Sequence, residues 1–270
     1  MTQDQRDADL LLSTQGSDGI MRLTLNDPAR RNALSEAMLA ALGAAFDAAS
    51  ANPDVRVIIL SAAGPVFCAG HDLKEMTARR QNADRGRAYF TKILDQCSSV
   101  MQKIVTCPKP VIAEIDGVAT AAGCQLVASC DLAVASKEAQ FCTPGVLIGL
   151  FCSTPMVALS RNLANKHAME MLLTGDMVSA SRAAEMGLVN KVVPSTELRA
   201  ASMALAGTIA AKSSLTVATG KRAFYQQKEM DLAAAYNYTS KIMVENMLAR
   251  DAEEGIAAFI EKRAPDWRDE

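Results

Sequence analysis

Phe67-Cys68-Ala69-Gly70-His71-Asp72-Leu73 is one of two stretches that decide the fold, and the other is Ala119-Thr120-Ala121-Ala122-Gly123-Cys124-Gln125-Leu126. Each places small residues at a predicted turn from a strand to a helix. Small residues let a backbone N–H group approach a ligand closely, because little side chain stands in the way. Two such N–H groups that converge on one oxygen form an oxyanion hole, which suits a thioester carbonyl that gains negative charge during reaction. The same residues also suit close packing alone, and the turns by themselves leave both interpretations open.

The segments around the two turns alternate between strand and helix patterns. Short continuous apolar runs, such as residues 57–60, are typical of strands that are buried on both faces. The expected strands are residues 20–25, 57–60, 111–115 and 132–135, and the expected helices are residues 35–50, 83–106 and 121–129, the first of them capped by Ser35. This rhythm predicts an α/β fold of stacked strand-strand-helix turns rather than a doubly wound sheet.

The last quarter of the chain has a different pattern. After Pro194 the sequence is almost entirely helical in character and rich in Ala, Met and Lys. We therefore expect residues 1–204 to form the core and residues 205–270 to form a helical region that packs on the core or on a neighbouring subunit. The helical region carries more apolar surface than one thin layer needs, which predicts a homotrimer or a hexamer.

Composition excludes several classes of partner. The net charge is -2, with 28 Lys and Arg against 30 Asp and Glu, so nothing argues for nucleic acid, which needs a basic face, while a local basic cluster for a phosphorylated small molecule stays open. Residues 139–160 carry no charge, but Pro144 and Pro155 with adjacent glycines interrupt any long helix. We expect buried turns around a ligand pocket there rather than a segment in a membrane.

The seven cysteines indicate a reducing compartment. Their number is odd and none lies in a C-x-x-C spacing, which argues against a disulfide framework or a zinc site. The first nine residues are polar and include three aspartates, unlike a secretory signal or an Arg-rich transit peptide. The two histidines, His71 and His167, are far apart and suggest no metal site. These features predict an intracellular, cytoplasmic protein.

Ordered matches along nearly the whole chain resemble the enoyl-CoA hydratase/isomerase (crotonase) superfamily. The matching residues are Asn32-Ala33-Leu34, 67–73, Lys109-Pro110-Val111-Ile112-Ala113, Asp116-Gly117, 121–124, Cys130-Asp131-Leu132, Ala139-Gln140-Phe141, Gly149, 172–175, 183–189 and 258–263. Within the superfamily, residues 120–126 and 149–155 look most like the subgroup named enoyl-CoA hydratase domain-containing protein 3. The resemblance implies a crotonase (ClpP-like) spiral of repeated ββα units, a C-terminal helical trimerisation region and usually a dimer of trimers.

The resemblance also implies a ligand and its contacts. The ligand would be an acyl-CoA thioester, and coenzyme A would enter as part of the substrate rather than as a separate cofactor. By position, the backbone N–H groups of His71 and Ala122 would form the oxyanion hole. The expected contacts to the substrate and to CoA are Arg30, Ala69, Lys74, Phe259 and Lys262, with Arg31 as a further candidate for the phosphates. Solvated surface charge remains the alternative for each basic residue.

Two positions depart from the family's hydratases. Where those enzymes carry two glutamates, this chain has Gln125 and Gly145, and neither can move a proton. Each proton-transfer group is worth roughly 10²–10⁴ in rate, so two-glutamate hydration is in doubt. Decarboxylation, double-bond isomerisation or another lyase step through a thioester enolate needs less acid–base machinery. The alternative is a non-catalytic acyl-CoA binder or scaffold.

A few further polar residues are candidates for roles in this region. Cys152, Ser153 and Thr154 are able to line an acyl pocket, although a turn or core role is expected for them. Asp72 is expected to cap the helix after the first turn, beside Glu75. Glu114 is unusual on a strand that should be buried on both faces, and it is expected to have a structural partner or to face a subunit contact.

Overall fold

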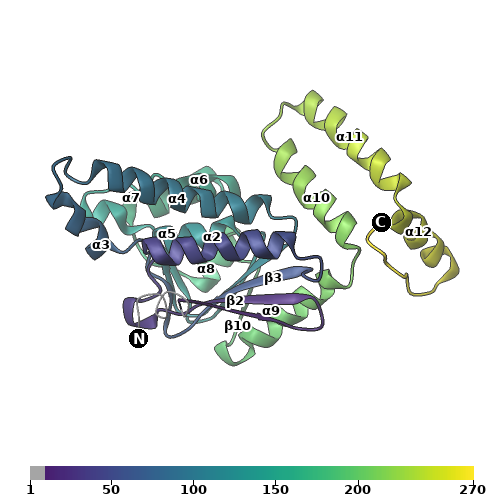
Figure 1. The fold of residues 1–270 in the computed structure, drawn as a ribbon, viewed down its shortest axis with the longest axis horizontal. Helices are drawn as coiled ribbons and strands as arrows, with labels where there is room; N and C mark the ends of the chain where they lie inside the picture. The colour runs from purple at the N-terminus through teal and green to yellow at the C-terminus, as the bar shows by residue number, and fades with distance from the viewer. Residues whose placement is uncertain (1–9) are drawn as a thin grey trace.

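The computed structural model describes residues 10–270, and the expectation for the polar residues 1–9 lies outside that range. Two β-sheets lie among the helices (Figure 1). The strands are β1 Leu11–Gln15, β2 Ile20–Leu25, β3 Val57–Ala62, β4 Val66–Cys68, β5 Val111–Ile115, β6 Val118–Thr120, β7 Leu132–Ser136, β8 Gln140–Cys142, β9 Val178–Ser179 and β10 Lys191–Val193. The helices are α2 Glu36–Ala51, α3 Leu73–Ala78, α4 Arg87–Thr106, α5 Ala122–Ser129, α6 Pro155–Asn162, α7 Asn165–Thr174, α8 Ala180–Met186, α9 Ser195–Ala210, α10 Ser214–Gln227, α11 Leu232–Leu248 and α12 Arg250–Glu261, with short 3-10 turns at Pro28–Arg30, Arg79–Gln81 and Pro144–Ile148.

The chain winds as a spiral between the two sheets. The larger sheet has the order β1-β2-β3-β5-β7-β10, and the smaller sheet has the order β4-β6-β8-β9. Strands β3, β5 and β7 enter the larger sheet, and the strands that follow each of them, β4, β6 and β8, enter the smaller one before the next helix begins. This arrangement confirms the predicted spiral of ββα units.

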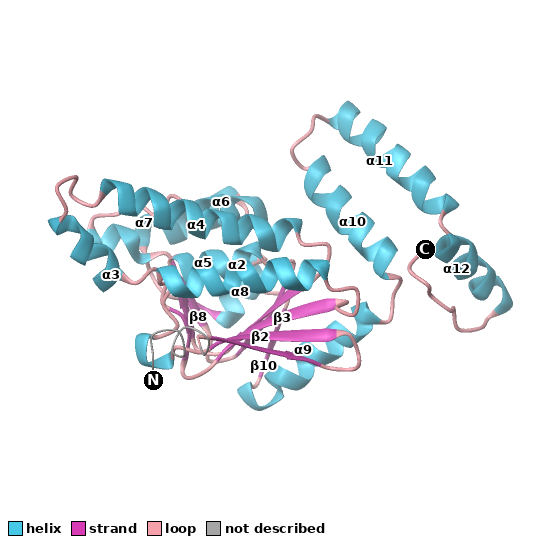
Figure 2. Ribbon diagram, viewed as in Figure 1, coloured by secondary structure: helices cyan, strands magenta, loops and turns pink. Residues whose placement is uncertain are grey.

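The larger sheet is covered on both faces, as Figure 2 shows. Ile58 and Leu60 of β3 belong to the main core with α2 and α4, whereas Val57 and Ile59 belong to a second cluster that includes side chains of α9. Because consecutive side chains of a strand point to opposite faces, a strand between two helical layers must be apolar at every position. The prediction that residues 57–60 form a strand buried on both faces is therefore confirmed.

The charge on strand β5 has a structural partner. Glu114 accepts two hydrogen bonds from the guanidinium of Arg22 on β2, at 2.6 and 2.9 Å, and the Ser202 hydroxyl of α9 also contacts it. Both side chains of the ion pair are 10% exposed. The pair joins two strands of the sheet to α9, and removal of one partner alone would leave a largely buried charge unpaired.

The C-terminal helices leave the core after α9. The boundary expected near Leu205 falls inside α9, which lies on the sheet to its end, and the chain departs only after Ala210. Helix α10 is fastened to the core by Lys221 and Tyr225, which donate hydrogen bonds of 2.6 and 2.9 Å to the two carboxylate oxygens of Asp131. Helices α11 and α12 extend away from the sheets (Figure 1), and α11 contains no buried residue.

The uncharged segment at residues 139–160 is only partly buried, and the expectation of buried turns there is wrong for its centre. The side chains of Leu147, Ile148, Leu150 and Phe151 are exposed, because the 3-10 turn that carries the first two lies at the surface. Among residues 10–270, none of the helices combines the length and the apolar character that crossing a bilayer requires.

Candidate active site

The two glycine-containing stretches, residues 67–73 and 119–126, lie against each other in the structure. Gly70 has a φ of +84°, and a Cβ at this position would lie 3.2 Å from the backbone nitrogen of Ala122. A Cβ at Gly123 would lie only 2.2 Å from the carbonyl oxygen of Cys68. The turn after β4 and the start of α5 are therefore in direct backbone contact, and only glycine fits at both points of contact.

The N-terminus of α5 carries free donor capacity. Ala122 is the first residue of α5, and no side chain caps this end of the helix. The first N–H groups of a helix have no partner within it, and the helix dipole favours negative charge beside them. Ala121, just before the helix, has φ 50° and ψ -117°, a conformation that glycine adopts far more easily than alanine. This local strain is concentrated at the predicted site.

His71 follows directly after Gly70 and pairs by a parallel bridge with Leu34, whose N–H donates a 2.8 Å hydrogen bond to the Gly70 carbonyl. Both ring nitrogens of His71 are buried and make no hydrogen bond with a described residue. Burial lowers the pKa of this imidazole, and the nearby backbone of Leu34 only partly opposes the shift. The ring is therefore neutral near pH 7, which fits a packing role for the side chain beside a backbone role for its N–H. The predicted cap is confirmed: Asp72 accepts hydrogen bonds from the N–H groups of Lys74 and Glu75.

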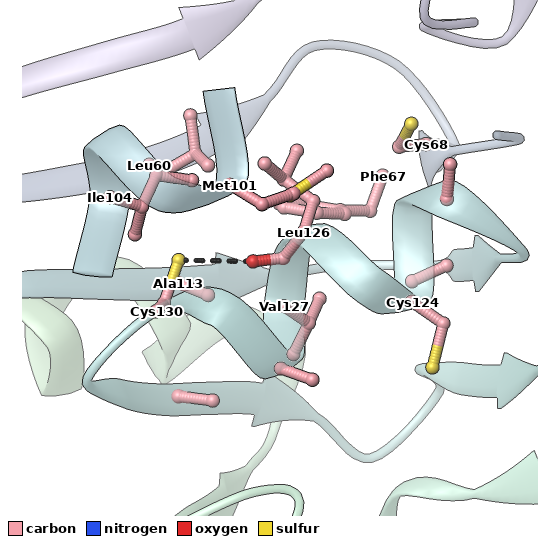
Figure 3. Packing of buried hydrophobic residues seen from close by; sticks show 14 of the residues in the cluster. Leu60, Phe67, Cys68, Met101, Ile104, Ala113, Cys124, Leu126, Val127 and Cys130 are labelled. Carbon is pink, nitrogen blue, oxygen red and sulfur yellow. Dashed lines mark hydrogen bonds between the residues drawn. The ribbon is translucent and has the colours of Figure 1, made fainter. Parts of the chain in front are cut away.

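Gln125 lies one turn further along α5 and is 3% exposed. Its side-chain Oε1 is buried and accepts no hydrogen bond from a described residue. Gln125 lines a cavity of about 500 Å³ that lies between α4, α5, α6 and α10 and opens to the surface. Other side chains of α5 pack into the core: Figure 3 shows Leu126 close to Met101 and Phe67, with Cys124 pointing away from them.

Gly145, the second position at which the sequence differs from the family's hydratases, is tightly enclosed. A Cβ there would lie 2.9 Å from Cys152 Sγ and 2.9 Å from the carbonyl oxygen of Leu150. The thiol of Cys152 thus fills the space that a side chain at position 145 would need. A glutamate fits only if the segment 150–152 moves.

The thiols near the site are not activated. Burial raises the pKa of Cys152, and a backbone hydrogen bond with Gly145 only partly offsets this effect. Burial also raises the pKa of Cys142 to about 11, with the neighbouring Cys152 adding to the shift. All seven cysteines are buried and free. Because the thiolate is the reactive form, these side chains are weak nucleophiles near neutral pH. Ser153 is exposed and Thr154 directly precedes α6, and neither of them lines the 500 Å³ cavity.

Three of the predicted CoA contacts lie around the first turn. The N–H of Ala69 donates a 3.1 Å hydrogen bond to the carbonyl of Arg31, which places the segment with Arg30 beside this turn. Arg30 forms a 2.8 Å ion pair with Asp27, so its charge is already partly balanced. Lys74 is exposed in the first turn of α3.

The remaining two predicted contacts are not brought to this place within one chain. Phe259, which is 85% exposed, lies near the end of α12, and Lys262 follows that helix. Figure 1 shows α12 and α3 at opposite ends of the longest axis of the molecule. Within one subunit, these residues are therefore far from the two turns.

Asn32 supports the site in a way that sequence reasoning missed. The backbone of Asn32 has a φ of 52°, and its side chain is buried. The side-chain amide nitrogen donates hydrogen bonds to the carbonyls of Ala63 and Val66 at 2.9 and 2.7 Å. Its amide oxygen accepts from the N–H of Asp27 at 2.8 Å. Asn32 thus fixes the connection between β3 and β4 that leads into the first turn. The turn-forming sequence Asn26-Asp27-Pro28 just before it was the available signal.

A curated relative corrects the predicted location. The chain is 50% identical over 257 residues to the rat protein named "Enoyl-CoA hydratase domain-containing protein 3, mitochondrial". The aligned region covers 95% of this chain and 84% of the rat protein. The mouse and human relatives carry the same name. These names point to mitochondria, and the prediction of a cytoplasmic location is wrong. Free buried thiols indicate a reducing compartment, but they do not distinguish one such compartment from another.

Solved structures share the fold over nearly the whole chain. A crystal structure of an enoyl-CoA hydratase from Mycobacterium smegmatis superposes with a TM-score of 0.91 at 50% identity, covering 96% of this chain and 98% of that one. The crystal structure of human enoyl-CoA hydratase domain-containing protein 3 gives a TM-score of 0.90 at 48% identity, covering 96% and 100%. The family model described as enoyl-CoA hydratase/isomerase matches residues 15–270. With this match and these relatives, the chain belongs to the enoyl-CoA hydratase/isomerase family and has the crotonase fold.

Proposed function

We propose that this protein binds acyl-CoA thioesters and holds the thioester oxygen between the backbone N–H groups of His71 and Ala122. The observation that carries this proposal is the backbone contact of the two turns, with Gly70 and Gly123 leaving no room for a Cβ. Two donors fixed in this way stabilise the negative oxygen of an enolate, and one such donor is typically worth about 3 kcal/mol in the transition state. Coenzyme A is part of the substrate in this proposal, and no separate cofactor is invoked.

The proposed reaction is one that passes through a thioester enolate without the paired glutamates. Gln125 and Gly145 supply no proton-transfer group, and burial keeps the thiol of Cys152 protonated. Decarboxylation, double-bond isomerisation or another lyase step fits these residues better than hydration. The same lack of acid and base favours a second candidate, a non-catalytic acyl-CoA binder or scaffold.

The proposed binding site is completed by a neighbouring subunit. We assign Arg30 and Lys74 to the CoA phosphates because both lie near the first turn. We assign Phe259 and Lys262 to the same ligand from another copy of the chain, because α12 lies far from α3 within one chain. Exposed apolar side chains on α11 and α12 support a homotrimer or a dimer of trimers: Leu232, Met243, Val244, Leu248, Phe259 and Ile260. Light scattering at micromolar concentration is expected to give a trimer or hexamer mass, and a monomer alone would contradict the assembly.

A panel of CoA thioesters, tested for binding and turnover together, separates the two candidate functions. Calorimetric titration is expected to give micromolar dissociation constants, about -8 kcal/mol. Turnover of any thioester in the panel supports the enzyme, and binding without turnover supports the scaffold. If no thioester of any chain length releases heat or competes for the site, the proposed function is wrong.

A further inference from the structure

The chain leaves the core through the short connection between α9 and α10, and Arg56 holds this connection in place. Arg56 directly precedes β3, and its guanidinium donates hydrogen bonds to the carbonyls of Ala210 and Lys212 at 2.7 and 2.6 Å. The same guanidinium forms a 2.9 Å ion pair with Asp269, whose other carboxylate oxygen accepts a 2.5 Å hydrogen bond from the N–H of Ser214. Asp269 therefore links the core to the first residue of α10.

Asp251, in the first turn of α12, binds the segment that contains Asp269. Asp251 is 1% exposed, and its carboxylate accepts hydrogen bonds of 2.9 Å from the N–H groups of Arg268 and Asp269. Its own N–H donates to the carbonyl of Glu270 at 3.0 Å. A buried carboxylate is costly unless hydrogen bonds replace its hydration, and these bonds form only while residues 268–270 lie against α12. The segment is therefore fastened to the start of α12 as well as to α10.

Trp267 adds a third attachment. Its indole N–H donates a 3.0 Å hydrogen bond to the carbonyl of Ala211, in the connection between α9 and α10. Its ring lies on α12 at Gly255, where a Cβ would approach the ring to 2.9 Å. Figure 1 shows this part of the chain returning from α12 toward the start of α10. We call residues 267–270 the brace, because they join the core, the start of α10 and the first half of α12.

The direction of α12 matters because this helix carries Phe259, with Lys262 directly after it. Both are expected to contact acyl-CoA that is bound to another copy of the chain. Helix α11 leads into α12 and contains no buried residue, so its own packing does little to fix α12. Phe259 lies eight residues beyond Asp251, about 12 Å along the helix, and a rotation of roughly 10° at the helix start would move it by about 2 Å. A shift of that size is enough to break a hydrogen bond or an apolar contact with the neighbouring copy.

We propose that the brace positions Phe259 and Lys262 for the acyl-CoA site of a neighbouring copy, with Asp269 as the central positioning residue. The inference rests on the proposed function, in particular on the completion of the site by another subunit. Asp269 contacts the core through Arg56 and α10 through Ser214, while the rest of the brace is bonded to α12. Removal of the Asp269 carboxylate leaves α12 folded but no longer fixes its direction relative to the core.

The test is calorimetric titration of hexanoyl-CoA into the natural protein, Asp269→Ala, Lys262→Ala and the double variant, with each mass measured by light scattering at the same concentration. Asp269→Ala and Lys262→Ala are each expected to weaken binding roughly 10-fold, about the effect of losing one hydrogen bond to a charged group. The double variant is expected to bind no more weakly than Asp269→Ala, because Lys262 is already out of place. Independent effects would multiply to roughly 100-fold.

The matched control is Asp266→Ala, which removes a carboxylate from the same part of the chain. The Asp266 side chain is 77% exposed and lies 3.9 Å from Arg268, so this variant is expected to bind like the natural protein. If Asp269→Ala does not fold, Trp267→Phe takes its place in the same comparison, because it loses the bond to Ala211 and keeps a ring on Gly255.

The outcomes separate this inference from the proposed function. Unchanged affinity in Asp269→Ala overturns the inference, and so do multiplying effects in the double variant. Dissociation of Asp269→Ala into monomers also overturns it, because the brace would then hold the assembly together rather than place two side chains. Binding of hexanoyl-CoA by a monomeric natural protein has the same consequence. Failure of every thioester to bind the natural protein overturns the proposed function itself.

Discussion

Gly123→Ala is expected to force the two turns apart. The added Cβ would lie 2.2 Å from the Cys68 carbonyl oxygen and 2.8 Å from its carbonyl carbon, well inside the 3.0 Å that real Cβ atoms keep. Overpacking typically costs about 1–3 kcal/mol, and the upper end applies because the obstacle is strand backbone rather than a flexible side chain. Alanine regains about 1 kcal/mol through its better helix propensity. We therefore expect a net loss of about 2 kcal/mol, which lowers the unfolding midpoint by roughly 4–8 °C for a chain of this size.

The matched control is Gly207→Ala in α9, where no atom lies within 4 Å of the added Cβ. The same chemical change is expected there to stabilise the protein by about 0.5–1 kcal/mol. Thermal unfolding followed by circular dichroism, at one fixed protein concentration for all variants, measures both effects. Acyl-CoA affinity is expected to fall for Gly123→Ala and to stay unchanged for the control. If Gly123→Ala unfolds at or above the temperature of the natural protein, the argument that backbone contact fixes the site is wrong.

Three other predictions concern the same region. Ala121→Gly relieves the φ of 50° and is expected to stabilise the protein by about 1 kcal/mol in denaturant unfolding, whereas a loss of stability would show that the alanine is unstrained. Burial lowers the pKa of His71 below the unfolded value of about 6.5, so the unfolded state binds protons more readily and the stability of the protein falls as the pH drops from about 7 to 5. His71→Phe is expected to lose less stability over this range, and parallel plots of stability against pH for the two proteins would refute this. The double variant Gln125→Glu, Gly145→Glu is expected to hydrate crotonyl-CoA faster than the natural protein. Adding Cys152→Gly to this pair is expected to raise the rate further, because the Cys152 thiol lies 2.9 Å from the Cβ that is introduced at position 145. Loss of the enoyl ultraviolet absorbance measures hydration, and a folded, substrate-binding variant with no gain would show that other groups are missing.

The longer elements were predictable because their patterns are local. Ser35 caps α2 as expected, with its hydroxyl accepting from the Met38 N–H, and the apolar run in β3 predicted a strand between two layers. Strands β4, β6 and β8 were missed, because each has three residues and is too short to show a period. The predicted helix over residues 83–106 begins only at Arg87, after Gly86 in a left-handed conformation.

Sequence alone determined the family and, through that resemblance, the expectation of a ββα spiral, together with the two glycine-containing turns and the absence of glutamate at positions 125 and 145. Only the tertiary structure showed that Oε1 of Gln125 is buried without a partner among the described residues, that Cys152 occupies the space beside Gly145, and that α12 lies far from α3. The physical reason is that hydrogen-bond partners, steric space and exposure depend on segments distant in sequence. The spacing of residues along one element sets which face each side chain takes, but it does not specify what that face meets.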